Sequence, residues 1–171
     1  MVKTKWSKCD ARFMKKISFY LLMIIVIFTG QFLMNHGLKT GQPPIIKQKA
    51  ISGEDIMQKV SKGPAIIYFW AEWCGVCNMM KQAMSNVSQD YPVITIAVKS
   101  GTKEKVQNYL HDQSLNWDVV NDPSGDIAEQ YQARGVPSIF FLDNSGEIVL
   151  TTSGYTSEIG LRLRLWLTQV F

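Results

Sequence analysis

The strongest candidates for catalysis in this sequence are Cys74 and Cys77, two cysteines one helical turn apart. A cysteine reacts as its thiolate, and the free N–H groups and dipole at a helix N-terminus favour the thiolate. Apolar residues recur at helical spacing from Cys74 onward, so a helix is predicted to begin at or beside it. We therefore predict thiol–disulfide exchange, with Cys74 as the attacking residue and Cys77 as the residue that resolves a mixed disulfide.

Hydrophobic patterning predicts the strands and helices around this cysteine pair. Continuous apolar runs rich in β-branched and aromatic residues predict buried strands, and apolar residues at helical spacing predict helices. The predicted strands cover residues 65–70, 93–98, 138–142 and 147–152. The predicted helices cover residues 52–62, 74–89, 103–111, 127–132 and 157–171. This order predicts an α/β fold with a mixed central sheet and helices on both faces.

An apolar run without a charged residue precedes this domain at residues 17–34. A helix needs roughly 20 apolar residues to cross a bilayer, so we predict a single transmembrane anchor here. Six of the 18 lysine and arginine residues precede the run, which predicts a basic cytoplasmic leader at residues 1–16. A cleaved secretory signal is the alternative, although residues 29–37 offer no Ala-x-Ala-like cleavage site. Either alternative exports the rest of the chain.

In a bacterium, this topology places the anchor in the inner membrane and the exported part in the periplasm, an oxidising compartment where disulfides persist. Residues 35–44 contain Gly41 and the pair Pro43-Pro44, a composition that breaks helices and runs extended. We therefore predict a short linker at residues 35–44, followed by one domain at residues 45–171.

Composition excludes several other functions. The chain is nearly neutral beyond the leader, so it shows no basic stripe for nucleic acid. Its three cysteines do not form a disulfide scaffold, and Cys9 in the leader is predicted to be an idle thiol, with lipidation as the alternative. With only His36 and His111 besides, the ligands are too few for a closed zinc site. The sequence therefore predicts neither a metal nor a cofactor.

Two separate motifs resemble the thioredoxin superfamily. They are residues 69–77, which contain the cysteine pair, and residues 135–138, which look like that family's cis-proline loop. The resemblance covers the whole predicted domain and implies a thioredoxin-like fold. It also implies that Val136 and Pro137 hold the substrate chain beside the active disulfide. Trp73 is a candidate substrate platform, because tryptophan is enriched at contact surfaces.

Three further stretches, residues 97–101, 120–123 and 154–164, look like the membrane-tethered branch associated with suppression of copper sensitivity. That branch belongs to the wider group that includes the reductases of cytochrome c maturation. The resemblance implies a reductase that acts on the disulfides of exported proteins and is supplied by a membrane electron donor. A disulfide oxidase or isomerase is the alternative within this class.

The chain departs from thioredoxin at two places. Tyr68 stands where thioredoxin has a buried acid that assists proton transfer, and a phenol is neutral near pH 7, so that role cannot be carried over. Glu72 is a candidate replacement, with an ordinary exposed loop acid as the alternative. Gly75 and Val76 separate the cysteines in place of Gly-Pro, which restores a backbone N–H near the sulfur and is expected to shift the redox potential.

Methionines near the cysteines suggest a rival function. Soft sulfur ligands select copper(I), so Cys74 and Cys77 with a methionine could bind that ion. The methionines in this region are Met79, Met80 and Met84. Met80 and Met84 lie at helical spacing from Cys77, which favours buried positions in the protein core for both side chains instead.

Overall fold

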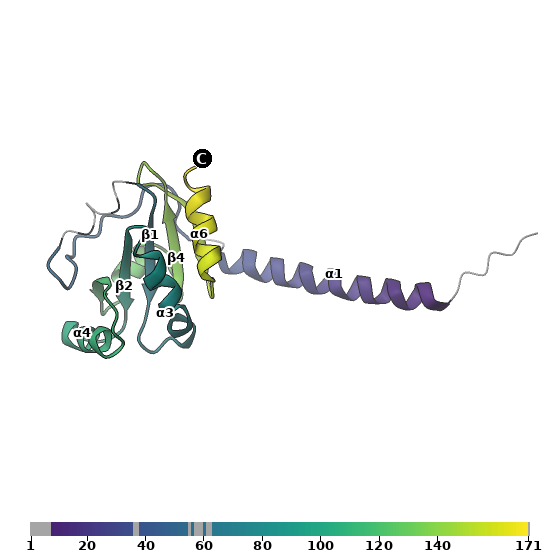
Figure 1. Ribbon diagram of the computed structural model, residues 1–171, viewed down its shortest axis with the longest axis horizontal. Helices are drawn as coiled ribbons and strands as arrows, with labels where there is room; N and C mark the ends of the chain where they lie inside the picture. Colours follow the sequence, from purple (N-terminus) through teal and green to yellow (C-terminus); the bar gives the residue numbers. More distant parts are fainter. Residues whose placement is uncertain (1–7, 36–37, 55, 57–59, 61–62, 171) are drawn as a thin grey trace, which may run out of the picture. The chain divides into compact units, whose positions relative to one another are not determined.

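The structure is a computed structural model that describes residues 8–35, 38–54, 56, 60 and 63–170 (Figure 1). The chain divides into two compact units, Met1–His36 and Gly37–Phe171. The first contains helix α1 (Lys8–Asn35), which includes all of residues 17–34. Over the described residues, no helix combines the length and the hydropathy that crossing a membrane requires.

The second unit is built on one five-stranded sheet with strand order β3-β2-β1-β4-β5. Its strands are β1 (Ala65–Trp70), β2 (Val93–Val98), β3 (Asp118–Asp122), β4 (Ser138–Leu142) and β5 (Ile148–Ser153). β1 pairs in parallel with β2, and β2 with β3, whereas β4 lies antiparallel to both β1 and β5. Every residue of β1, β2 and β4 is buried, as continuous apolar runs predict. The predicted mixed sheet is confirmed.

Among the described residues, the helices that cover the sheet are α3 (Gly75–Val87), α4 (Lys103–Asp112), α5 (Asp126–Gln130) and α6 (Glu158–Leu167). α6 packs against α3 and β4, and its Leu161 and Leu165 share one apolar cluster with Met80 and Met84 of α3. Ile127 of α5 belongs to a second cluster on the opposite face of the sheet. Helices therefore cover both faces, as predicted.

The described segments differ from the prediction in two places. β3 was not predicted, because this edge strand has only five residues and two buried valines to mark it. The predicted helix at residues 52–62 falls partly on residues outside the described ones, and the described residues 51–53 form a turn.

The segment from Leu38 to Pro44, predicted as linker, contacts the domain. Gly41 exchanges two backbone hydrogen bonds with Ile148, at N···O distances of 2.9 and 2.8 Å. The Tyr131 hydroxyl donates to the Pro44 carbonyl at 3.0 Å, and Leu38 packs against the core. These bonds use backbone groups at the edge strand β5 that would otherwise lack partners. Residues 38–44 thus belong to the second compact unit, and the predicted domain bounds of 45–171 stay a prediction.

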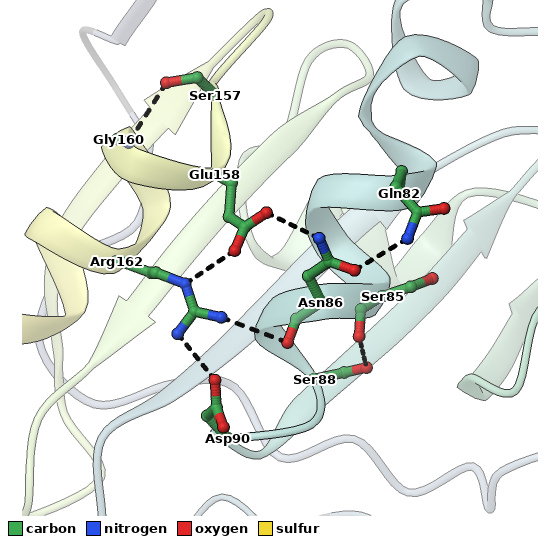
Figure 2. Close-up of polar contacts among 9 residues, drawn as sticks. All are labelled: Gln82, Ser85, Asn86, Ser88, Asp90, Ser157, Glu158, Gly160 and Arg162. Atoms are coloured by element: carbon green, nitrogen blue, oxygen red, sulfur yellow. Dashed lines mark hydrogen bonds and ion pairs between the residues drawn. The ribbon is translucent and has the colours of Figure 1, made fainter.

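A polar cluster joins the start of α6 to the end of α3 (Figure 2). Arg162 donates to Glu158 at 2.9 Å and to Asp90 at 2.8 Å, and the Asn86 amide donates to the other Glu158 oxygen at 2.8 Å. The hydrogen bonds from Asn86 and Arg162 lower the pKa of Glu158. The cluster fixes α6 against the helix that carries the cysteine pair.

Candidate functional site

A disulfide joins Cys74 and Cys77 at the N-terminus of α3, with an S–S distance of 2.10 Å. Cys74 is the N-cap residue, and its Sγ accepts a hydrogen bond from the Cys77 N–H at 3.1 Å. After reduction, the same N–H would face the Cys74 thiolate and stabilise its negative charge. Cys74 is 7% exposed and Cys77 is 2% exposed, so Cys74 is the more accessible of the two residues.

The loop at residues 135–138 lies beside this disulfide. The peptide bond between Val136 and Pro137 is cis, and the Val136 carbonyl oxygen lies 3.7 Å from the Cys74 Sγ. Pro137 is buried and its carbonyl accepts from Gly154 N at 3.0 Å, whereas Val136 is partly exposed. The structure thus brings together residues that lie about 60 positions apart, as the resemblance implied; their substrate-binding role stays a prediction.

Trp73 stands beside Cys74 with 63% of its surface exposed. Its Nε1–H donates to the Lys99 carbonyl oxygen at 3.2 Å, which holds the indole ring in one position. A groove of about 680 Å³ runs from Trp73 to Val136. Trp73 therefore lines this groove, and its role as a substrate platform stays a prediction.

Tyr68 is fully buried in the core beneath the cysteine pair. Its ring packs edge-on against Trp117 at a centroid distance of 6.0 Å, and its hydroxyl has no hydrogen-bond partner within the described part of the chain. Burial, with a smaller contribution from Tyr109, raises the pKa of Tyr68. Tyr68 is therefore a neutral phenol that cannot replace an ionisable carboxyl group.

Glu72 forms an ion pair with Lys105 of α4, and its backbone N–H donates to the Ser100 hydroxyl at 3.2 Å. It lines a cavity of about 200 Å³ together with Cys74 and Tyr109. Burial raises the pKa of Tyr109, and the negative charge of Glu72 adds to that rise. Sequence reasoning missed Lys105 and Tyr109, because they come from a helix whose docking next to the cysteines has no local signal.

The methionines divide between the core and the surface. Met80 and Met84 are fully buried beneath the cysteine pair, whereas Met79 is 70% exposed. His111 is exposed at the end of α4, beside Asp112. Within the part of the chain that the structure describes, no three His, Cys, Asp or Glu side chains gather where they could hold a metal ion.

Comparison with known proteins identifies the family. A sequence model of the AhpC/TSA family matches residues 41–151, more than half of the chain. The chain belongs to the AhpC/TSA family. A thioredoxin-like protein of Haemophilus influenzae is 36% identical over 109 residues, which cover 63% of this chain and 65% of that protein. The chain thus spans just under two thirds of that relative.

Among the other proteins that resemble this chain, one has a name that refers to disulfide chemistry. The sporulation thiol-disulfide oxidoreductase A of Bacillus subtilis is 24% identical over 119 residues, which cover 66% of this chain and 72% of that protein. The crystal structure of StoA from Bacillus subtilis superposes with a TM-score of 0.61 at 23% identity, covering 73% of this chain and 97% of that one. The crystal structure of a DsbF homologue from Corynebacterium diphtheriae superposes with a TM-score of 0.64 at 17% identity, covering 78% of this chain and 96% of that one. The predicted thioredoxin-like fold is confirmed.

Proposed function

We propose that this protein is a thiol–disulfide oxidoreductase that exchanges disulfides with exported proteins. The observation that carries the proposal is the disulfide at the start of α3, with Cys74 as the more accessible residue beside the Val136 carbonyl. The names of relatives such as the Bacillus subtilis sporulation oxidoreductase support it.

The reaction proceeds in two exchange steps when the protein acts as a reductase. The Cys74 thiolate attacks a substrate disulfide, forms a mixed disulfide and releases one substrate thiolate. The Cys77 thiolate then attacks the Cys74 sulfur and releases the second substrate thiolate. Two electrons pass to the substrate, the two released thiolates take up protons from solvent, and the Cys74–Cys77 disulfide remains. A membrane electron donor would supply two electrons to reduce it again.

Trapping of substrates tests this proposal. In a Cys77→Ala variant the resolving thiol is absent, so covalent adducts with exported proteins should accumulate and disappear on addition of reductant. A variant that also carries Cys74→Ala should trap none. Absence of adducts in the single variant, with folded protein present, would refute disulfide exchange as the function. Stoichiometric copper(I) binding without adducts would instead support the copper-binding alternative. The burial of Met80 and Met84 does not favour that alternative.

We further propose that residues 17–34 tether the domain to a bacterial inner membrane, with residues 1–16 in the cytoplasm and the domain in the periplasm. Exposed apolar side chains of α1, among them Leu21, Ile24 and Val26, support a lipid contact. The full chain should then sediment with membranes and resist extraction by high salt. A variant that lacks residues 1–36 keeps the compact second unit and should stay in the supernatant. Recovery of the full chain in the supernatant would contradict the tether.

A further inference from the structure

The groove beside the cysteine pair is bordered by charged side chains from three separate segments. Lys99 follows β2, Glu129 belongs to α5, and Arg134 directly precedes the loop at residues 135–138. Trp73 and Val136 complete its lining next to Cys74. We call this surface, defined by Trp73, Lys99, Glu129, Arg134 and Val136, the charged groove.

Lys99 is fixed in the wall of the charged groove by its backbone and its side chain. Its φ is +48°, in the left-handed region that residues with a Cβ rarely adopt. Its N–H donates to the Asp122 carbonyl at 2.9 Å, while its own carbonyl accepts from Trp73. The side chain lies over Gly125, where an added Cβ would come within 2.9 Å of the Lys99 Cε. A strained residue held by several neighbours is typical of functional sites.

The charges of the groove do not neutralise one another. Two cations, Lys99 and Arg134, face one carboxylate, Glu129. Among the described residues, neither cation forms an ion pair, although Lys105 nearby is paired with Glu72. The charged groove therefore presents an excess of positive charge, and it is lined by Val136, whose carbonyl oxygen lies 3.7 Å from the Cys74 sulfur.

We propose that the charged groove selects client proteins whose reacting cysteine is flanked by acidic residues, and that Lys99 and Arg134 determine this specificity. The proposal rests on the exchange reaction proposed above and adds the chemistry of its substrate. An extended client segment bound at Val136 would cross the groove toward Trp73, within reach of both cations. Opposite charges across such a contact favour encounter and fix the register of the bound chain.

Exchange rates with matched peptides test the proposal. The reduced full-length protein is mixed with three peptide disulfides that differ only in whether the flanking residues are acidic, neutral or basic. At low ionic strength the acidic peptide should react about tenfold faster than the neutral one, at the lower end of what electrostatic steering achieves. In the double variant Lys99→Gln, Arg134→Gln, the ratio of the acidic to the neutral rate should approach one. In the wild-type protein the same ratio should fall as salt is added.

Two further variants make the result specific to the groove. Glu129→Gln removes the opposing carboxylate and should increase the acidic preference, whereas a double variant at the exposed residues Lys47 and Lys49, each replaced by Gln, should leave it unchanged. Because each comparison is a ratio of rates on one protein, a change in Cys74 reactivity cancels. A wild-type ratio near one with rapid exchange would overturn the groove proposal alone. If the protein reacts with none of the three peptides, the proposed exchange reaction itself is wrong.

Discussion

Replacing Cys74 with serine is expected to reduce the rate at which this protein reduces a model protein disulfide by at least about a thousandfold, because a serine hydroxyl is not ionised near neutral pH. Cys74, at 7% exposure, is the expected attacking residue, and Cys77, at 2% exposure, is the more deeply buried of the pair. The measurement is the initial rate of disulfide reduction by the reduced full-length protein, with a chemical reductant as electron source.

Cys9 provides the matched control for this variant. It lies in the basic leader, so Cys9→Ser should retain the wild-type rate. Circular dichroism should show the same fold for both variants, since serine is close to cysteine in size and can also cap a helix N-terminus. Substantial reduction by the Cys74→Ser protein would mean that another thiol attacks the substrate, and the assignment of roles to Cys74 and Cys77 would be wrong.

The parts of the site that could be predicted from the sequence are those with a local signal. A cysteine pair one turn apart at the end of an apolar strand fixes both the helix start and the position of Cys74, and the structure has both. The approach of Val136 to within 3.7 Å of Cys74 was available only through the family resemblance, because no pattern within residues 135–138 says what they pack against.

The parts that could not be predicted depend on tertiary contacts. β3 is recognisable as a strand only through its pairing with β2. Residues 38–44 are recognisable as a segment that contacts the domain only through bonds such as those between Gly41 and Ile148. Lys99 reads in the sequence as an ordinary residue after a strand. Its importance comes from a left-handed backbone and from Gly125, which lies 26 positions later and leaves room for its side chain.

Asp122 illustrates how such hidden contacts support the site, and its loss is expected to have the largest effect on stability. Asp122 is 2% exposed, and its carboxylate accepts hydrogen bonds from three backbone N–H groups, those of Gly125 at 3.1 Å, Ile127 at 3.3 Å and Ala128 at 3.0 Å. These bonds begin α5 and shape the turn that carries Gly125 beneath Lys99.

Asp122→Ala would leave two buried N–H groups and one part-buried N–H group without their acceptor and should lower the free energy of unfolding by about 3 kcal/mol. For a chain of this length, such a loss corresponds to a fall in Tm of roughly 6–12 °C. Urea unfolding of the oxidised protein measures it, with Asp126→Ala as control, because Asp126 lies exposed in the same segment and should change stability by less than about 0.5 kcal/mol. Equal losses in the two variants would contradict the role of the buried carboxylate. Since the turn also holds Lys99 in the charged groove, the Asp122→Ala protein should lose much of the acidic preference while still reducing neutral disulfides through Cys74.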